Sequence, residues 1–404
     1  MPTDTVGLDA AEARGRLRVI VAGISALILT IGLARFSYTP LLPVMRVQAG
    51  LSYAAGGWLA TSNYLGYIAG VLLAASIADL ECKFRLYRLC LVLAVATTMA
   101  MGLTTNVALW LVLRFVSGAA SIGGPLLSSG LVLNWLMRHG RRPELGLHFT
   151  GLGLGIVLSG LAVAAMSAHL AWDAQWIAFG VLGLAFFVPA WIWLPAPGPV
   201  PAAHAEAYTR PPSRSWMWLL VGAYFCAGWG FVTSGTFIVA ILEKLPTFAG
   251  RGSWTWVALG LAATPSAFLW DRIARAIDMI PALLLAYALQ TLSIVIPLLT
   301  ANLASNLLGA MLFGSTFVGI VSLMLALIGR CFPENPAKAM ARLTISYGIA
   351  QTVAPALAAL LATTAGGYRG SLGIAGGVMA IGVVLIAIIG ARHGAGAAVG
   401  ERAG

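Results

Sequence analysis

Twelve long apolar runs, each about the length of a helix that crosses a bilayer, set the first limit on what this chain can fold into. A membrane-spanning helix needs about 20 predominantly apolar residues. The runs cover roughly residues 19–45, 52–78, 85–104, 106–136, 144–168, 173–194, 215–242, 253–270, 279–300, 302–329, 337–363 and 370–391. Only 9% of the 404 residues are charged, against about 25% in an ordinary soluble domain. The sequence therefore predicts an all-α membrane protein of about 12 transmembrane helices.

The longest polar interruption falls at the midpoint of the chain, at 195–214, and it is rich in proline. Proline lacks a backbone donor and disrupts helices, so this segment is expected to be an extended linker. The predicted organisation is an N-terminal six-helix half over 1–194, a cytoplasmic linker over 195–214, and a C-terminal six-helix half over 215–404.

An acidic residue followed by basic residues recurs at equivalent places in the two halves. Asp79, Lys83 and Arg85 follow the second run, and Asp271 and Arg275 follow the eighth. Two similar halves joined by a linker indicate parallel repeats about an axis along the membrane normal. We interpret both loops as gating segments, in which Asp79 pairs with Lys83 or Arg85.

The distribution of the 24 Lys and Arg residues predicts the orientation. If the N-terminus is cytoplasmic, 18 of them fall on the cytoplasmic side, two (Arg35 and Arg114) lie inside helices, and four fall outside: Arg46, Lys244, Arg251 and Arg369. Such a bias predicts an inner-membrane protein with both termini in the cytoplasm. The net charge of +11 sits in short clusters between apolar runs, not on one solvated face, which argues against nucleic acid as a partner.

Several motifs resemble the major facilitator superfamily along the whole chain. Asp79 and the basic residues after it retain part of the superfamily's 2–3 loop signature, although the glycine that normally follows the aspartate is missing. Arg114 and Gly118 match its Arg-x-x-x-Gly pattern on the fourth helix. Residues 34–45, Ala-Arg-Phe-Ser-Tyr-Thr-Pro-Leu-Leu-Pro-Val-Met, resemble the YbfB/YjiJ-like branch of predicted efflux permeases.

The resemblance implies a secondary active transporter that moves a small organic solute across the inner membrane by alternating access, and the branch that it resembles is one of predicted efflux permeases. A broad-specificity drug exporter and a non-transporting membrane sensor on the same fold are the alternatives. We expect no enzyme activity, because the chain lacks a clustered nucleophile and base. No cofactor or metal site is predicted either, and the expected partners are the substrate and lipid, with the protein a monomer.

Two arginines inside apolar runs are the main candidates for a substrate site. A guanidinium in a membrane is costly, so Arg35 should face the bundle interior and bind an anion with help from Tyr38, unless it reaches the interface instead. Arg114 is expected either to bind the substrate or to serve coupling or helix packing. All 13 acidic residues lie in tails, loops or helix ends, which favours an anionic or neutral substrate.

Polar side chains on other runs complete the predicted substrate site. They are Asn63, Tyr67, Thr236, Tyr347 and Gln351, of which Asn63 and Tyr67 share one helix face. Such groups also bond across helices as structural contacts. His148 is expected to be an interfacial histidine near a cytoplasmic loop, and the Gly66-x-x-x-Gly70 and Gly151-x-x-x-Gly155 faces are expected to allow close helix packing.

Overall fold

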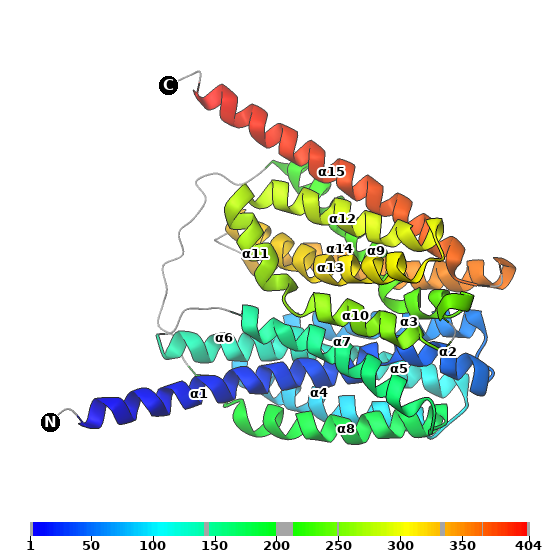
Figure 1. Ribbon diagram of the computed structural model, residues 1–404. Helices are drawn as coiled ribbons and strands as arrows, with labels where there is room; N and C mark the ends of the chain where they lie inside the picture. Colours follow the sequence, from blue (N-terminus) through cyan, green and yellow to red (C-terminus); the bar gives the residue numbers. More distant parts are fainter. Residues whose placement is uncertain are drawn as a thin grey trace. The chain divides into compact units, whose positions relative to one another are not determined.

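A computed structural model describes residues 3–140, 145–198, 213–248, 250–331, 336–365 and 367–401, and these residues form helices and connecting turns with no strand among them (Figure 1). They contain 11 helical segments long and apolar enough to cross a membrane. The chain divides into two compact units, one of residues 1–49 and 62–203 and the other of residues 50–61 and 204–404. All-helical architecture is thus confirmed.

The first unit contains most of the elements that surround the two buried arginines. Its elements in chain order are α1 (Thr3–Leu27), η1 (Ile28–Phe36), α2 (Tyr38–Gln48), α3 (Tyr53–Ser76, shared with the second unit), α4 (Leu80–Met101), α5 (Val107–Ala120), η2 (Ser121–Gly123), η3 (Gly124–Ser128), α6 (Ser129–Arg138), α7 (Gly146–Met166) and α8 (Trp172–Trp193). Each predicted run of this half has a helical counterpart, and the first span is longer than predicted, at Ala13–Gln48.

Two of these spans are not regular α-helices. The first changes into a nine-residue π-helix, η1, and the fourth passes through a 3₁₀ turn, η2, and a short π-helix, η3. A π-helix shifts the backbone hydrogen-bond ladder by one residue, and such segments often occur at functional sites. All nine side chains of η1 are buried, and Arg35 lies at its end.

The second unit repeats the helical pattern with one break. Its elements are α9 (Arg214–Leu242), η4 (Pro246–Phe248), α10 (Gly252–Ala263), α11 (Ser266–Ile277), α12 (Met279–Leu299), α13 (Leu303–Cys331), α14 (Pro336–Ala365) and α15 (Arg369–Glu401). The predicted run 253–270 is split into α10 and α11 at Thr264 and Pro265, and each piece is shorter than the other spans. This break explains why 11 segments, not 12, have full membrane-spanning length.

The expected loop position of Asp271 and Arg275 is wrong. Both residues lie within α11, where Nη2 of Arg275 is 2.5 Å from Oδ2 of Asp271 one helical turn away. Proline has no backbone N–H, so the helix is interrupted at Pro265 and a new helix carries the charged residues. Both side chains are more than half exposed, so the pair contributes little to stability.

Glycines allow the close packing expected from their spacing. A Cβ on Gly66 of α3 would collide with the carbonyl oxygen of Phe115 on α5, and one on Gly155 of α7 would press on the backbone of Gly32 in η1. A Cβ on Gly151 would likewise meet the Ile24 carbonyl. Both predicted small-residue faces are therefore confirmed as helix contacts.

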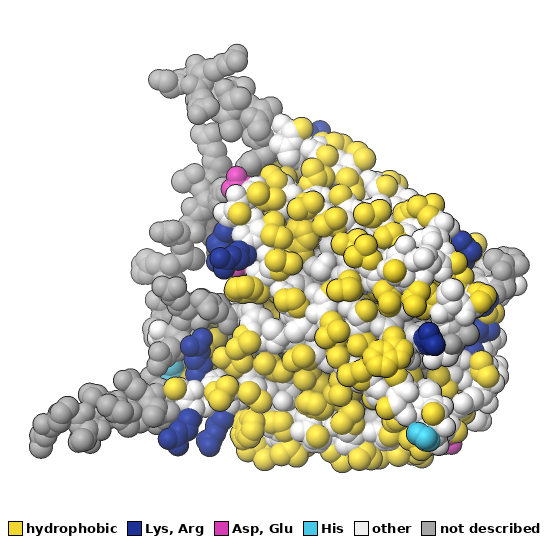
Figure 2. Space-filling model, viewed as in Figure 1, with side chains coloured by type: hydrophobic (Ala, Val, Ile, Leu, Met, Phe, Trp, Pro, Cys, Tyr) yellow, Lys and Arg dark blue, Asp and Glu magenta, His cyan; other side chains and the backbone are white. Residues whose placement is uncertain are grey.

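Apolar side chains cover the sides of the helices and charged side chains lie near their ends (Figure 2). Exposed residues such as Leu72, Val181 and Leu308 are about half accessible or more, which suits a surface that faces acyl chains. The start of the predicted linker is tied to α6, because Asn134 donates to the Gly198 carbonyl (3.0 Å) and accepts from its amide (3.3 Å). Linker residues 199–212 lie outside the described residues.

Candidate functional site

Arg35 lies inside the first unit with its guanidinium between two aromatic rings. Its Cζ atom is 4.5 Å from the ring centroid of Tyr64 and 4.5 Å from that of Tyr67, both on α3. The side chain is 5% exposed, and Nη1 donates to Oγ of Ser121 in η2 at 3.4 Å. The Nε–H is buried without a hydrogen-bond partner among the described residues. Both rings lie within cation–π distance of the guanidinium.

Arg114 is held differently, because its terminal nitrogens contact the backbone of the first span. Nη1 donates to the carbonyl oxygen of Ala34 (3.3 Å) and Nη2 to that of Arg35 (3.4 Å). Its Cζ lies 4.6 Å from the ring centroid of Tyr38, and the side chain is 3% exposed. Arg114 thus fixes the end of the π-helix η1, and its charge lies next to that of Arg35.

Neutral polar groups complete this network. Asn63 donates from Nδ2 to the carbonyl oxygen of Arg114 (2.8 Å), and Ser117 donates to that of Ala34 (3.0 Å). The Asn63 Oδ1 atom is buried without a partner among the described residues. Five of the predicted substrate residues therefore lie in one network within the first unit: Arg35, Tyr38, Asn63, Tyr67 and Arg114.

No carboxylate accompanies these two cations in the part of the chain that the structure describes. The described ion pairs are Arg85 with Glu81 and Arg275 with Asp271, both at exposed positions. Moving an ion out of water costs several kcal/mol unless it is paired. The site is consequently an electropositive cluster with donors available for an anion.

The sequence offers Tyr64 as a residue that could line a cavity, but it does not point to Ser121. Tyr64 is 4% exposed and lies against Arg35, and Ser121 supplies the only hydrogen bond that the described structure gives that guanidinium. Tyr64 was visible as an aromatic residue beside Asn63, but the 3₁₀ turn that directs Ser121 toward Arg35 has no clear sequence signal.

The remaining predicted substrate residues lie in the second unit. Tyr347 on α14 packs its ring 4.6 Å from Tyr224 and 6.0 Å from Phe231, both on α9. Gln351, one turn further along α14, is 3% exposed and its Oε1 has no partner among the described residues. Thr236 on α9 is also buried. Tyr347 thus belongs to an aromatic cluster with Tyr224 and Phe231.

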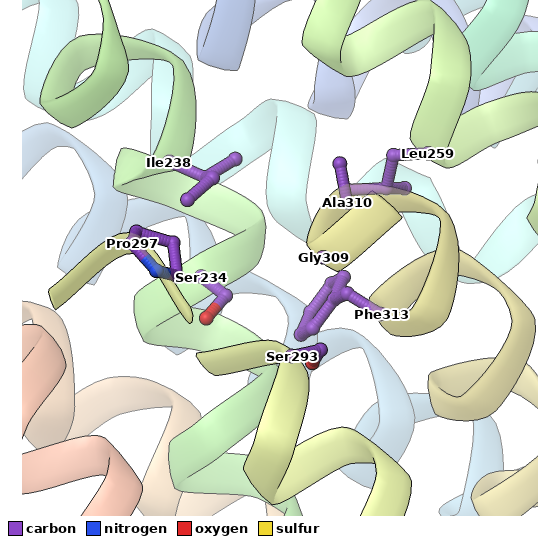
Figure 3. Close-up of a pocket in the computed structure, with 8 residues that line it drawn as sticks. All are labelled: Ser234, Ile238, Leu259, Ser293, Pro297, Gly309, Ala310 and Phe313. Carbon is purple, nitrogen blue, oxygen red and sulfur yellow. The ribbon is translucent and has the colours of Figure 1, made fainter. Parts of the chain in front are cut away.

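A small cavity of ≈ 10 Å³ is also found in the second unit (Figure 3). It is lined by Ser234, Ile238, Leu259, Ser293, Pro297, Gly309, Ala310 and Phe313. This volume admits about one water molecule, and an organic solute does not fit. Pro297 has no N–H to donate to the Ser293 carbonyl, and the Ser234 hydroxyl is buried without a partner, so the cavity has polar groups suited to a water.

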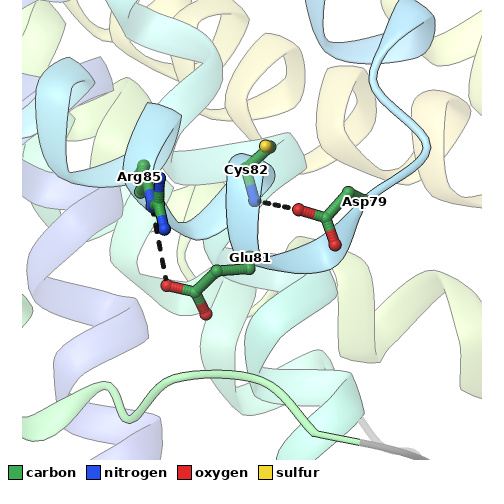
Figure 4. A network of polar contacts seen from close by, with 4 residues as sticks. All are labelled: Asp79, Glu81, Cys82 and Arg85. Atoms are coloured by element: carbon green, nitrogen blue, oxygen red, sulfur yellow. Dashed lines mark hydrogen bonds and ion pairs between the residues drawn. The ribbon is translucent and has the colours of Figure 1, made fainter.

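The expected pairing of Asp79 with Lys83 or Arg85 is wrong. Asp79 is the N-cap of α4, and its Oδ2 accepts the backbone N–H of Cys82 at 2.9 Å (Figure 4). Arg85 instead lies 3.8 Å from Glu81. Hydrogen bonds from Cys82, and then from the Glu81 amide, hold the pKa of the Asp79 carboxyl below its usual value. A carboxylate at a helix start satisfies free N–H groups, which explains this arrangement.

His148 is also placed differently from the expectation. The side chain is 1% exposed on α7, with Nε2 2.8 Å from Oγ of Ser129 and Nδ1 buried without a partner among the described residues. It packs against α1, where a Cβ on Gly23 would collide with the imidazole. His148 is therefore a buried helix contact, and not an interfacial side chain.

A bundle of apolar spans that holds charged and polar side chains in its interior defines a polytopic membrane transporter. The chain belongs to the major facilitator superfamily, because residues 27–387 match the sequence model of the family described as "Uncharacterised MFS-type transporter YbfB". The resemblance of helix 1 to this branch is confirmed.

Relatives from fungi carry the same general description. The MFS-type transporter phm3 of Pyrenochaetopsis sp is 28% identical over 166 residues, which is 41% of this chain and 34% of phm3. The MFS-type transporter MFS19 of Alternaria alternata is 28% identical over 172 residues, 41% of this chain and 35% of MFS19. The chain thus spans about a third of the length of these relatives.

Solved structures of transporters share the fold at low sequence identity. The nucleoside transporter NupG superposes with a TM-score of 0.69 over 93% of this chain and 98% of NupG, at 13% identity. A bacterial homologue of the human lysosomal transporter Spinster gives a TM-score of 0.66 over 92% of this chain and 96% of that chain, also at 13% identity. These likenesses confirm the major facilitator fold.

Proposed function

We propose that the protein is a secondary active transporter of a small organic anion, and that Arg35 binds the negatively charged group. The observation that carries the proposal is a guanidinium that is 5% exposed, lies beside a second buried arginine, and has no carboxylate partner among the described residues. A buried charge of this kind is stabilised most effectively by an ion of opposite sign.

The geometry of Arg35 supports a planar acceptor such as a carboxylate. The rings of Tyr64 and Tyr67 lie against the cation, and Nη1 bonds to Ser121. The edge formed by Nε and Nη2 remains, and a guanidinium edge grips a carboxylate through two parallel hydrogen bonds. A buried donor without a partner costs about 1–3 kcal/mol, and a bound carboxylate removes that cost.

Arg114 contributes to the same site indirectly, through the backbone that carries Arg35. Its terminal nitrogens are engaged with the carbonyls of residues 34 and 35, so we assign it a positioning role and a share of the positive field. Transport is proposed to follow alternating access, outward across the inner membrane with cytoplasmic termini. The direction rests on the YbfB-like branch, and the orientation rests on the Lys and Arg bias.

A stability screen of the purified protein tests the substrate class. A ligand that binds the folded state raises the apparent melting temperature. We expect carboxylates to stabilise the protein while their amide and amine analogues do not. Stabilisation by amines alone would contradict the proposal and favour a cationic-drug exporter. A carboxylate that stabilises the protein but is not exchanged by proteoliposomes would favour the membrane sensor.

A further inference from the structure

A second guanidinium in the first unit, that of Arg88, lies against two aromatic rings about two turns after the start of α4 at Leu80. The Cζ atom of Arg88 is 4.6 Å from the ring centroid of Phe84 and 4.7 Å from that of Trp191 on α8. Its Nε is buried without a partner, and the structure gives the guanidinium no hydrogen bond or ion pair to a described residue. The proposed transport site does not use this cation.

The position of the two rings places the Arg88 guanidinium near the membrane surface. Phe84 lies one turn closer than Arg88 to the start of α4, so the arginine side chain reaches back toward the helix end. Trp191 lies in the last turn of α8, and tryptophan at the end of a span typically sits at headgroup level. The Tyr87 hydroxyl donates to the Ala190 carbonyl at 2.8 Å and fixes α4 against α8 at this level.

The helix faces beneath this cation are apolar and exposed. Val92 lies one turn deeper than Arg88 on α4 and is 44% exposed, and Val188 lies one turn deeper than Trp191 on α8 and is 52% exposed. Residues i and i+4, or i and i+3, share a helix face. An acyl chain can therefore run along Val92 and Val188 while its headgroup lies at Arg88.

The charges at this end of the unit complement an anionic headgroup. The Glu81 carboxylate is paired with Arg85 at 3.8 Å, and Asp79 caps α4. Lys83, which is half-buried and two residues after Glu81, adds a positive charge. Neither acid is therefore left to neutralise Arg88, whose guanidinium edges match the geometry of phosphate oxygens.

We propose that Arg88 and Trp191 form a binding site for the phosphodiester of an anionic phospholipid, with its acyl chain against α4 and α8. The lipid belongs to the leaflet at the basic ends of the helices, which the Lys and Arg bias assigns to the cytoplasmic side. The inference is independent of the solute that is transported. A hydrogen bond that involves charged groups corresponds to about a tenfold or larger change in affinity, beyond the general attraction of basic residues to an anionic membrane.

The test compares lipid-dependent stability of the full-length protein in detergent. Phosphatidylglycerol, phosphatidylcholine with the same acyl chains, and inorganic phosphate are titrated while the melting temperature is followed. Phosphatidylglycerol is expected to raise it more than the other two. Arg88→Gln is expected to need about tenfold more phosphatidylglycerol for half of the effect. Arg85→Gln removes the same charge at a position that is 76% exposed, and it should respond as the wild type does.

Equal titrations of Arg88→Gln and Arg85→Gln would overturn the proposal, because they would show only general attraction between charges. Inorganic phosphate that matches phosphatidylglycerol would also overturn it, since the site would then bind a free ion. If Arg88→Gln does not fold, Trp191→Leu keeps the cation and removes one ring. That variant is expected to weaken the phosphatidylglycerol response, and an unchanged response would contradict the site.

Discussion

Nη2 of Arg114 donates to the carbonyl oxygen of Arg35 at 3.4 Å, so one buried arginine holds the backbone that carries the other. The two cations therefore differ in what they can do. Both arginines have a buried Nε–H without a partner among the described residues. Arg114 uses both terminal nitrogens on the first span, whereas Arg35 uses only Nη1, on Ser121. A substrate anion is expected to meet Arg35 directly and Arg114 through its field.

Replacing Arg114 should affect stability more than ligand choice. Arg114→Gln removes both contacts to the carbonyls of residues 34 and 35, and hydrogen bonds that involve a charged group are worth about 1.5–3 kcal/mol. We expect a lower melting temperature with the order of preference among carboxylates unchanged. Melting curves with and without a carboxylate panel measure both quantities. A reversed preference at normal stability would make Arg114 a direct ligand contact.

Gly66 tests the close packing of α3 on α5. Gly66→Ala places a methyl group against the Phe115 carbonyl, and overpacking of this kind typically costs about 1–3 kcal/mol. Gly130→Ala on α6 is the matched control, because nothing lies within 4 Å of its Cβ position. The control should be neutral or slightly stabilising, since alanine favours helix. Similar melting temperatures for the two variants would contradict the packing described.

Substitutions of Asp79 separate its role as a helix cap from the effect of its negative charge. Asparagine caps a helix about as well as aspartate, so Asp79→Asn should keep its stability at neutral pH while Asp79→Ala loses some. The lowered pKa means that the aspartate's contribution is present above its unfolded-state pKa and is lost as the pH falls through the native one. Melting temperatures measured from pH 7 into the acid range should fall further in the wild type than in Asp79→Asn. An equal acid dependence in the wild type and Asp79→Asn would contradict the assignment.

Topology is tested by impermeant thiol labelling of intact cells in a cysteine-free background. Cysteines at Ala203 and Ala398 should resist the reagent, because the Lys and Arg bias places the linker and the C-terminus inside. Val47→Cys is the positive control, since Val47 is 84% exposed in a segment expected outside. Labelling of Ala203→Cys from outside, at the rate of the control, would reverse the orientation.

The sequence indicates the membrane class and the main residues of the site for simple physical reasons. Long apolar runs predict spans, and an arginine such as Arg35 within one of them must face the interior. Pro265 marks a possible helix break in the sequence. The charged residues after it have the composition of a loop, although the structure places them in α11. An aspartate followed by basic residues can be a helix cap or an ion-pair partner, and the sequence does not distinguish the two. The hydrogen bond from the Cys82 amide identifies Asp79 as a cap.

The details around Arg35 could not be predicted in the same way. A π-helix results from a shift of the hydrogen-bond ladder, which tertiary contacts such as Gly32 against Gly155 accommodate, and composition does not reveal it. The placement of Tyr64 and Tyr67 against one guanidinium depends on the rotation of α3 relative to η1. Polar residues of the second unit, such as Gln351, remain predictions as substrate contacts.

The central claim is that Arg35 binds an anionic group through the edge of its guanidinium. Arg35→Lys keeps the charge but loses the planar pair of donors, and Arg35→Ala removes both. We therefore expect carboxylate affinity to fall in that order, with a loss of about 2–5 kcal/mol in Arg35→Ala if the pair is desolvated. Tyr67→Phe, which keeps the ring over the cation, is the matched control and should bind nearly as the wild type does.

The most direct measurement is calorimetric titration of one stabilising carboxylate, beside its amide analogue, into the wild type and these three variants. Affinity that falls from wild type through Arg35→Lys to Arg35→Ala, for the carboxylate and not for the amide, is the predicted result. Equal carboxylate affinity in the wild type and Arg35→Ala, with both proteins folded, would contradict the account.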